Sequence, residues 1–175
     1  MRKTYRYRLY PSKSQVTLLE QTLEICRWVY NDTLALRKNA WEQEQHSISL
    51  YETNKILTQW KKERPELNRV HSQVLQNVQM RVDLAFKSFF RRVEAGENPG
   101  YPRFKGKGRY DSFTYPQSGF KLDGDRLHLS KIGDVKIILH RPIEGTIKTC
   151  TVRRSSTGKW YACFSVEYDP TPAPQ

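Results

Sequence analysis

The sequence predicts an α+β protein in which one strand precedes a helical region and a group of strands follows it. Apolar and polar residues alternate between Lys3 and Leu9, which is the period of a half-buried strand. Apolar residues then recur every three or four positions up to about Glu94, as in amphipathic helices, and alternation returns after Tyr110. With 175 residues and 37% apolar content, the chain can form a sizeable core.

A long helical segment follows the first strand. Pro11 ends the strand, and Ser12 with Gln15 three residues later fits a capping box, a polar pattern that begins many helices. The pattern predicts one long helix to about Glu44, or two helices in tandem with a short link near Ile25. The apolar residues that define its buried face are Leu19, Leu23, Cys26, Tyr30 and Leu34.

Two further helices are expected before the strands return. The segment from Leu50 to Lys62 carries apolar residues at helical spacing, and Pro65 stops it. The segment from about Ser72 to Glu94 carries a wide apolar stripe, which predicts the central helix of a bundle. The stripe consists of Leu75, Val78, Val82, Ala85, Phe86, Phe89 and Val93.

After the helices the composition shifts to Gly, Pro, Lys and Arg, and beyond Tyr110 the chain is predicted to be β. Asp123-Gly124 and Thr157-Gly158 are turn signals typical of hairpins. The Pro-rich segment from Asp169 to Gln175 cannot join a sheet, so we interpret it as an interdomain linker. The expected strands are Ser112–Tyr115, Arg126–Leu129, Val135–Leu139, Thr146–Arg154 and Trp160–Tyr168.

The composition indicates a polyanionic partner. Thirty Lys and Arg residues stand against eighteen Asp and Glu, which gives a formal net charge of +12 and a pI near 9.7. A mean hydropathy of −0.77 and the lack of a long apolar run exclude a membrane-spanning helix. The charged N-terminus lacks the apolar core of a signal peptide, so we expect a cytoplasmic protein. Three cysteines without a C-x-x-C pair favour buried thiols over disulfides or a zinc site.

The positive charge is gathered in four places along the chain. One of them is a Gly-rich loop with cations at alternate positions, where the backbone can come close to phosphates, and we favour nucleic acid over a merely solvated loop. The four groups are Arg2, Lys3, Arg6 and Arg8; Arg37 and Lys38; Arg103, Lys105, Lys107 and Arg109; and Arg153 and Arg154.

Aromatic and amide side chains add candidate nucleic-acid contacts. Aromatic rings beside cations can stack on unpaired bases, although core packing is the commoner role of any single ring. These rings are Tyr5, Tyr7, Tyr101, Phe104, Tyr110, Trp160 and Tyr161. Gln73, Gln76 and Asn77 lie at the head of a predicted helix, from which amides can read adenine edges in a major groove.

The sequence contains no complete set of catalytic residues. Its four histidines lack the spacing of metal ligands. Asp111, Asp123, Asp125 and Asp134 lie in or beside expected turns, whereas a two-metal hydrolytic site needs carboxylates converging from a rigid sheet. No P-loop, G-x-S-x-G motif or Cys/His pair is present. We therefore predict a binding module with no catalytic or metal-ligating residues and no cofactor of its own.

Several motifs, in order, resemble one known family. They run Tyr7-Arg8-Leu9-Tyr10-Pro11, Cys26-Arg27-Trp28-Val29-Tyr30-Asn31, Leu75-Gln76-Asn77, Ala85-Phe86-Lys87-Ser88-Phe89-Phe90, Tyr101-Pro102-Arg103-Phe104-Lys105, Val152-Arg153-Arg154 and Gly158-Lys159-Trp160-Tyr161-Ala162. Together they resemble the N-terminal half of TnpB, also called OrfB, a family of transposon-encoded RNA-guided DNA endonucleases related to type V CRISPR effectors. The resemblance covers essentially the whole chain.

The resemblance implies an oligonucleotide-binding-like β-barrel, the wedge domain, with an inserted helical bundle, the recognition domain. The implied segments are a first wedge strand over 1–10, the recognition domain over 11–98, the rest of the wedge over 99–168 and the linker over 169–175. A RuvC-like nuclease domain with an Asp, Glu, Asp site and a zinc ribbon would follow the linker. Mg²⁺ and Zn²⁺ are expected only for that nuclease half.

The resemblance also implies which residues contact which partner. The expected partners are a guide RNA derived from the transposon end and double-stranded target DNA, with no membrane. The wedge cations Arg2, Lys3, Arg6, Arg8, Arg103, Lys105, Lys107, Arg109, Arg153 and Arg154 would hold RNA. A short DNA motif beside the target would be read by Tyr51, Lys55, Ser72, Gln73, Gln76, Asn77, Thr114 and Tyr115. Of these, Tyr51, Gln76 and Thr114 match residue types used in the family, whereas Lys55, Ser72, Gln73 and Tyr115 depart from those of one family member, so the motif read here is expected to differ.

Three functions fit this reading of the sequence. The first is the guide-RNA- and target-DNA-binding portion of a transposon-associated RNA-guided endonuclease. The second is a nuclease-free RNA-guided transcriptional repressor, and the third is a transposase-type domain that binds DNA without RNA. In each case the protein would act in a prokaryotic cytoplasm and lie on the nucleoid when bound to DNA.

Overall fold

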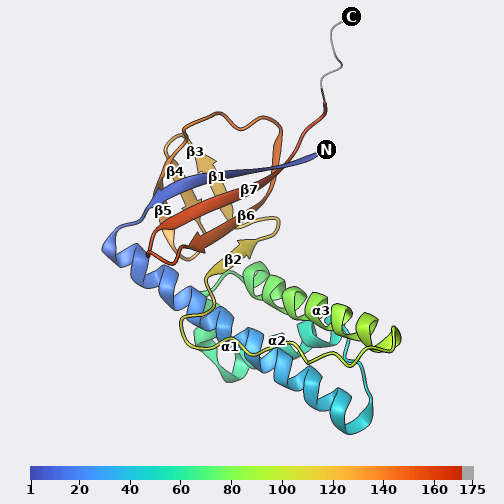
Figure 1. Cartoon of the computed structure of the whole chain (residues 1–175). Coiled ribbons are helices and arrows are strands. Elements are labelled where there is room, and N and C mark those ends of the chain that lie inside the picture. Colours follow the sequence, from blue (N-terminus) through green and yellow to red (C-terminus); the bar gives the residue numbers. More distant parts are fainter. Residues whose placement is uncertain (171–175) are drawn as a thin grey trace, which may run out of the picture. The chain divides into compact units, whose positions relative to one another are not determined.

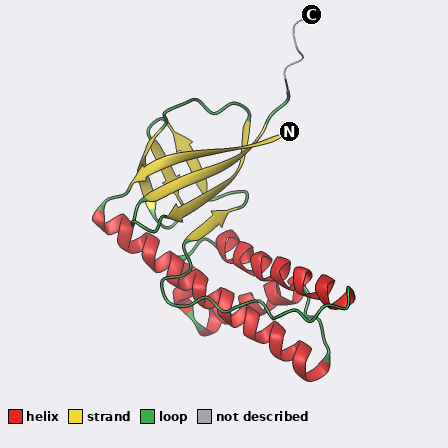
Figure 2. Ribbon diagram, viewed as in Figure 1, coloured by secondary structure: helices red, strands yellow, loops and turns green. Residues whose placement is uncertain are grey.

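A computed structural model describes residues 1–170; residues 171–175, most of the expected linker, lie outside the described residues. Strand β1 (Arg2–Tyr10) is followed by α1 (Lys13–Glu44), α2 (Leu50–Glu63), the 3-10 helix η1 (Pro65–Arg69) and α3 (Ser72–Glu94). The remaining strands are β2 (Ser112–Tyr115), β3 (Phe120–Asp123), β4 (Arg126–Leu129), β5 (Gly133–Ile138), β6 (Thr146–Arg154) and β7 (Trp160–Glu167). Along the chain the helices follow β1 and precede the other strands, and Figures 1 and 2 show a strand-only sheet and a group of helices, which confirms the α+β class.

The chain forms two compact units, one containing Met1–Glu20 with the segment from Asp111 onward, and the other containing Gln21–Tyr110. In the first unit, seven antiparallel strands form one sheet in the order β2-β6-β7-β1-β5-β4-β3. The two edge strands are joined by residues 116–119 only. The Tyr115 hydroxyl donates to the Ser130 carbonyl at 2.9 Å, and the Tyr115 and Phe120 ring centroids are 6.3 Å apart. These contacts bring the edges together, so the sheet is a nearly closed barrel with seven strands where an oligonucleotide-binding fold has five.

Alternation along the strands fills the barrel. On β1, Tyr5, Tyr7 and Leu9 are at most 2% exposed and point inward, as the spacing predicts. Gly145 permits a close approach behind β7: its φ is +105°, and a Cβ at this position would lie 2.5 Å from the Glu167 carbonyl oxygen. A larger residue would therefore push β7 out of place.

The strands that carry clear alternation lie where the sequence predicts them. The additional strand is β3, which was not expected because only three residues separate the bend at residues 116–119 from Asp123-Gly124. Pairing with β4 supplies what a run this short lacks, since Phe120 to Asp123 align with Leu129 to Arg126.

Helix α1 is continuous through Ile25, so the alternative of two tandem helices is wrong. No Gly or Pro interrupts residues 13–44, and the five apolar residues of its predicted face are at most 7% exposed. The expected capping box is confirmed: the Gln15 amide donates to Ser12 Oγ at 3.3 Å, and the Ser12 amide donates to Gln15 Oε1 at 3.0 Å.

The helical unit is held together by polar as well as apolar contacts. Gln79 Nε2 donates to the Thr53 carbonyl at 2.7 Å and joins α3 to α2. Arg37 Nη1 donates to Asp83 Oδ1 at 2.8 Å, and the Arg37 guanidinium lies 5.0 Å from the Phe86 ring centroid. Arg37 is 4% exposed. The expectation that Arg37 belongs to a surface patch with Lys38 is therefore wrong, because its charge is used inside the bundle.

Candidate nucleic-acid interface

The outer face of the barrel gathers cations from β1 and β6, on either side of β7. Side chains that alternate with the buried residues of β6, β7 and β1 point away from the core. The register places Arg153 of β6 opposite Tyr161 of β7, and Tyr161 opposite Arg8 of β1. Arg6 lies two residues earlier on β1 and points the same way. We call Arg6, Arg8, Arg153 and Tyr161 the Arg-Tyr face.

Tyr161 is the centre of this face. The Arg6 guanidinium lies 3.9 Å from the Tyr161 ring centroid, and the Arg8 guanidinium lies 5.7 Å from it. Arg8 also lies 4.7 Å from the ring centroid of Tyr10, which is 46% exposed. These cation–π contacts hold the two guanidiniums in place, and Arg8 Nε also donates to the Leu9 carbonyl at 3.3 Å. Guanidinium donors that form no hydrogen bond within the protein suit a partner that accepts hydrogen bonds, such as phosphate.

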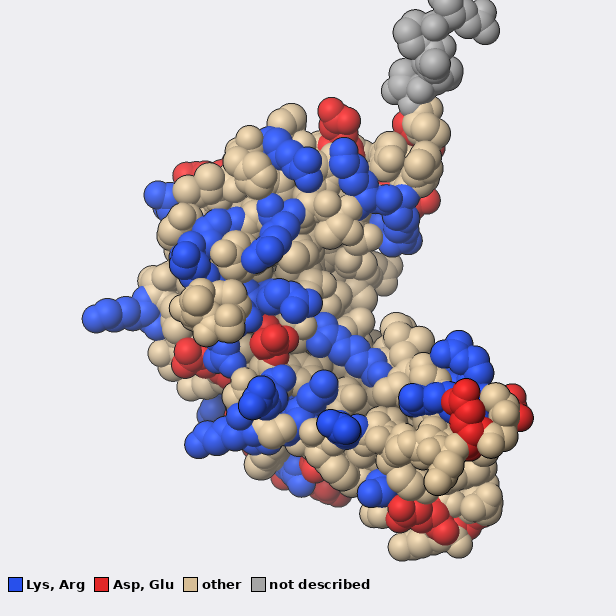
Figure 3. All heavy atoms as spheres, in the orientation of Figure 1, with Lys and Arg blue, Asp and Glu red and all other residues tan. Residues whose placement is uncertain are grey.

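The positive charge of the Arg-Tyr face is not neutralised within the described part of the chain. Arg6, Arg8 and Arg153 form no ion pair with any carboxylate among residues 1–170. The positive charge also acts on the half-buried Cys163. Burial raises the pKa of its thiol above the ordinary value, and the charges of Arg153 and Arg6 oppose this rise. Figure 3 shows Lys and Arg gathered over this side of the barrel.

Two of the expected RNA-binding cations, Arg154 and Lys3, point elsewhere, whereas Arg2 points the same way as the Arg-Tyr face. Arg154 is next to Arg153 in sequence but faces the core side, where its guanidinium lies 5.9 Å from the Trp160 ring centroid. Lys3 is on the core-facing side of β1, and its ammonium lies 5.2 Å from the Tyr5 ring centroid. Arg2 shares the outward direction of Arg6, and its Nη1 donates to Ser165 Oγ at 3.1 Å.

The remaining cations lie on the segment from Tyr101 to Tyr110, which we call the basic loop. Asn31 of α1 fixes this loop in both directions: Nδ2 donates to the Lys105 carbonyl at 2.9 Å, and Oδ1 accepts from the Lys105 amide at 2.8 Å. Arg27 Nη1 donates to the same carbonyl at 3.1 Å. Arg27 also binds Glu24, and this hydrogen bond lowers the pKa of the Glu24 carboxyl despite partial burial. Arg103, Lys107 and Arg109 stay exposed on the loop, and Lys105 is half-buried.

Most of the expected DNA-reading residues are accessible. Tyr51 is 67% exposed, and Lys55 lies one turn further along α2 with its ammonium 4.7 Å from the Tyr51 ring centroid. On α3, Ser72 and Gln76 are exposed, and Gln73 and Asn77 are half-buried. Helices α2 and α3 pack together, so these two groups lie in one unit.

The two expected DNA-reading residues of β2 differ from each other. Thr114 is half-buried, and its hydroxyl lies 2.8 Å from the Thr151 hydroxyl of β6. Tyr115 is 1% exposed and belongs to the barrel core, with its hydroxyl bound to Ser130. Strand alternation turns Thr114 outward and Tyr115 inward, so Tyr115 cannot reach a partner from this position and is corrected to a core residue.

Sequence reasoning missed three contributors. Tyr161 appeared only as one of several aromatic residues, and its central place follows from the pairing of β1 with β7, which no local pattern reveals. Asn31 and Arg27 were noted for family resemblance but were given no role. Their proximity to Lys105 spans more than 70 positions, so spacing could not find it.

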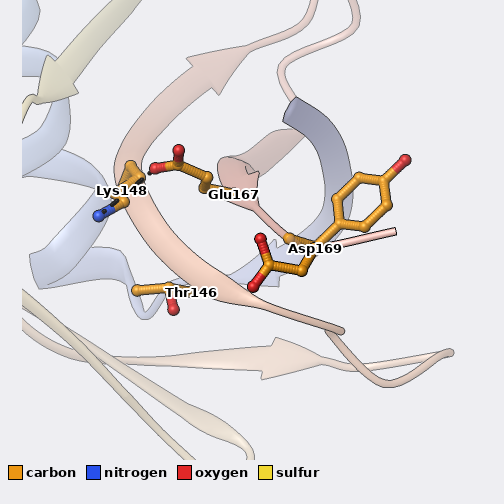
Figure 4. Close-up of a pocket in the computed structure, with 5 residues that line it drawn as sticks. Thr146, Lys148, Glu167 and Asp169 are labelled. Carbon is orange, nitrogen blue, oxygen red and sulfur yellow. Dashed lines mark ion pairs between the residues drawn. The ribbon is translucent and has the colours of Figure 1, made fainter. Parts of the chain in front are cut away.

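A shallow pocket of about 220 Å³ lies where β6 begins and β7 ends (Figure 4). It is lined by Thr146, Lys148, Glu167, Tyr168 and Asp169. Lys148 Nζ forms an ion pair with Glu167 Oε2 at 3.6 Å. One cation against two carboxylates gives this pocket a negative balance, so it does not extend the Arg-Tyr face. Residues 1–170 contain no cluster of three or more His, Cys, Asp or Glu side chains able to hold a metal, and none of their helices is long and apolar enough to cross a membrane.

The chain is similar to several known proteins. A family described as a helix-turn-helix domain, of the OrfB and IS605 type, matches residues 1–46. In this structure those residues contain β1 and a single helix. A candidate RNA-guided DNA endonuclease of Streptomyces pristinaespiralis is 33% identical over 180 residues, covering 99% of this chain and 44% of that protein. The candidate RNA-guided DNA endonuclease InsQ of Escherichia coli K12 is 32% identical over 169 residues, covering 94% of this chain and 40% of that protein.

A cryo-EM structure of a Cas12f1–sgRNA–target DNA complex contains a chain with a similar fold. The TM-score is 0.52 at 10% sequence identity, over 99% of this chain and 50% of that one. At this identity the likeness concerns the fold alone. This chain spans less than half the length of both curated relatives.

The fold and the charged face define a class: a basic protein that combines a nearly closed antiparallel barrel with an inserted helical bundle. Within this class, the comparisons confirm the resemblance to the N-terminal part of TnpB/OrfB, the RNA-guided DNA endonuclease family.

Proposed function

We propose that this chain is the guide-RNA- and target-DNA-binding portion of a TnpB/OrfB RNA-guided DNA endonuclease. The Arg-Tyr face is the observation that carries the proposal. Arg6 and Arg8 of β1 are held by aromatic rings, and Arg153 of β6 lies on the same face across β7; none of the three has a carboxylate partner among residues 1–170. Such a surface attracts phosphates and releases counterions when it binds them.

The barrel cations and the helical unit would contact different nucleic acids. The Arg-Tyr face, with Arg2, would hold the phosphates of the guide RNA, and the basic loop would add Arg103, Lys107 and Arg109. On the helical unit, Tyr51, Lys55, Ser72, Gln73, Gln76 and Asn77 would read the short DNA motif beside the target, together with Thr114 of the barrel. Amide and hydroxyl side chains on helices are suited to base edges, whereas guanidiniums suit the backbone.

Cleavage would belong to residues outside this segment. The RuvC-like domain and zinc ribbon of the family would supply the metal-dependent chemistry with Mg²⁺ and Zn²⁺, and this segment would supply binding. The proposal therefore assigns no catalytic residue and no cofactor to the chain described above.

The nucleic acid that copurifies with the protein tests this function. We expect bound nucleic acid that resists DNase and disappears with RNase, and sequencing should return one dominant RNA derived from a transposon end. Nucleic acid removed only by DNase would support the transposase-type alternative and contradict the proposal. The protein–RNA complex should then bind duplex DNA matching the guide. If the full-length parent carries the RNA but does not cut such DNA, the repressor alternative holds.

A further inference from the structure

We infer that the basic loop binds an unpaired nucleotide, with its base stacked on Phe104 and its neighbouring phosphates on Arg103 and Arg109. The inference rests on the proposed function, because it assumes a nucleic-acid partner. It adds that the nucleic acid is single-stranded, and not a duplex, where it contacts the basic loop.

Phe104 carries the first part of the argument. Its side chain is 50% exposed although the loop around it is anchored to α1. The other two rings of the segment are packed: Tyr110 is 5% exposed, and Tyr101 stacks on Phe89 with centroids 4.7 Å apart and planes 21° apart. Tyr101 and Tyr110 are therefore tied to the helical core, whereas half of the Phe104 side chain stays accessible. Exposing so large an apolar surface on a fixed loop is unfavourable unless a partner covers it.

The charges around Phe104 indicate what that partner is. No Asp or Glu occurs between Glu97 and Asp111, and four cations do. Arg103 and Arg109 are exposed and form no ion pair within the described residues. The Lys38 ammonium lies 5.0 Å from the Tyr101 ring centroid and 6.0 Å from that of Phe104. A protein partner that covered the ring would have to desolvate these charges, whereas a nucleotide presents both a flat base and a phosphate.

The backbone of the loop is preorganised for such a ligand. Asn31 and Arg27 hold Lys105, the residue after Phe104, through three hydrogen bonds. The Arg109 amide donates to the Gly106 carbonyl at 3.0 Å, and Gly108 has a φ of +74°. Residues 106–109 therefore form a tight turn, which fixes the backbone at Arg109. Because the loop is ordered before binding, the ring and the cations need not be immobilised by the ligand. Asn31 is thus a positioning residue, and Phe104 makes the contact.

Fluorescence anisotropy with the full chain tests the inference. The probes are a short unstructured RNA and an RNA duplex of the same length, each titrated over a range of salt concentrations. The variants are Phe104→Ala, Phe104→Trp and, as a control with another exposed apolar residue of the helical unit, Val93→Ala. Loss of base stacking should weaken single-strand binding of Phe104→Ala about tenfold, leave duplex binding unchanged, and be restored by Phe104→Trp.

The salt dependence separates stacking from charge. Phe104→Ala should shift the line of log affinity against log salt without changing its slope, whereas Arg103→Ala should reduce the slope by about 0.7. Single-strand affinity of Phe104→Ala equal to that of Val93→Ala would overturn the inference and leave the ring to a protein contact. An equal loss on single strand and duplex would also overturn it. If the wild-type chain binds neither probe at low salt, the proposed function itself fails, which is a different result.

Discussion

Removing the carboxylate of the buried ion pair in the helical unit should destabilise that unit strongly. Asp83→Asn keeps the side-chain volume but leaves the Arg37 guanidinium, 4% exposed, without its anion at 2.8 Å. Its remaining neighbour, the Phe86 ring at 5.0 Å, cannot replace a carboxylate. Loss of one partner of a buried pair costs about 3–5 kcal/mol, because the other charge stays buried. For a protein of this size that is a fall of roughly 6–20 °C in melting temperature.

Urea unfolding followed by circular dichroism at the helical wavelength measures this change. Lys87→Ala is the matched control, because Lys87 binds the other oxygen of Asp83 at 3.2 Å but is 71% exposed. It should cost about 1 kcal/mol or less. The double change Arg37→Met with Asp83→Leu should recover most of the lost stability, since no charge then remains buried. If Asp83→Asn costs no more than Lys87→Ala, the pair is solvated and the reasoning is refuted.

The same pair gives a pH dependence. Burial raises the pKa of Asp83, but hydrogen bonds and charge from Arg37 and Lys87 outweigh it and hold the pKa below its ordinary value of 3.8. A carboxyl with a depressed folded pKa contributes stability above its unfolded pKa and loses it as the pH falls through the folded pKa. The stability gap between wild type and Asp83→Asn should therefore be constant near neutrality and shrink below about pH 4. A gap that stays constant down to pH 2 would contradict this.

Three further predictions concern the barrel and the interface. Arg153→Ala should reduce the slope of log RNA affinity against log salt by about 0.7–0.9. Arg154→Ala should keep this slope but lower the stability of the barrel, because the Arg154 guanidinium packs on Trp160. Equal slopes for the two variants would contradict the opposite orientations of the two side chains. Gln76→Ala should change the DNA motif selected from a randomised duplex library by the protein–RNA complex, losing about 1–3 kcal/mol of discrimination at one position, and a uniform loss of RNA affinity would count against its reading role. Gly145→Ala should destabilise the barrel by about 2 kcal/mol or more, since its Cβ would lie 2.5 Å from a carbonyl oxygen. Gly124→Ala, with φ +58° and open space around it, should cost only about 1 kcal/mol in the same urea titration.

Local patterns were sufficient to predict most of the fold. Strand and helix periods are properties of neighbouring residues, so β1, α3, β6 and β7 lie where alternation and apolar stripes place them. The features that the sequence did not predict depend on contacts between distant residues. Strand β3 is stabilised by pairing with β4, and the closure of the barrel depends on Tyr115 reaching Ser130.

The candidate site shows the same division. The sequence identified the basic clusters, because charge is visible residue by residue. It could not tell which cations share a face: Arg153 and Arg154 are adjacent in sequence but point to opposite sides, and Arg37 is buried by Asp83 from a helix 46 positions away. The role of Tyr161 likewise depends on strand register, which is set by the whole sheet.

The central claim is that the placement of charge on the Arg-Tyr face, rather than net charge, binds the RNA. The most direct test compares two triple variants with the copurified RNA over a range of salt concentrations. One changes Arg6, Arg8 and Arg153 to Ala, and the other changes the exposed Lys13, Lys62 and Arg69 to Ala, so each lowers the formal charge from +12 to +9. We expect the first variant to reduce the slope of log RNA affinity against log salt by about 2 to 3, and the second variant to keep nearly the whole slope. Equal losses in the two variants would contradict it.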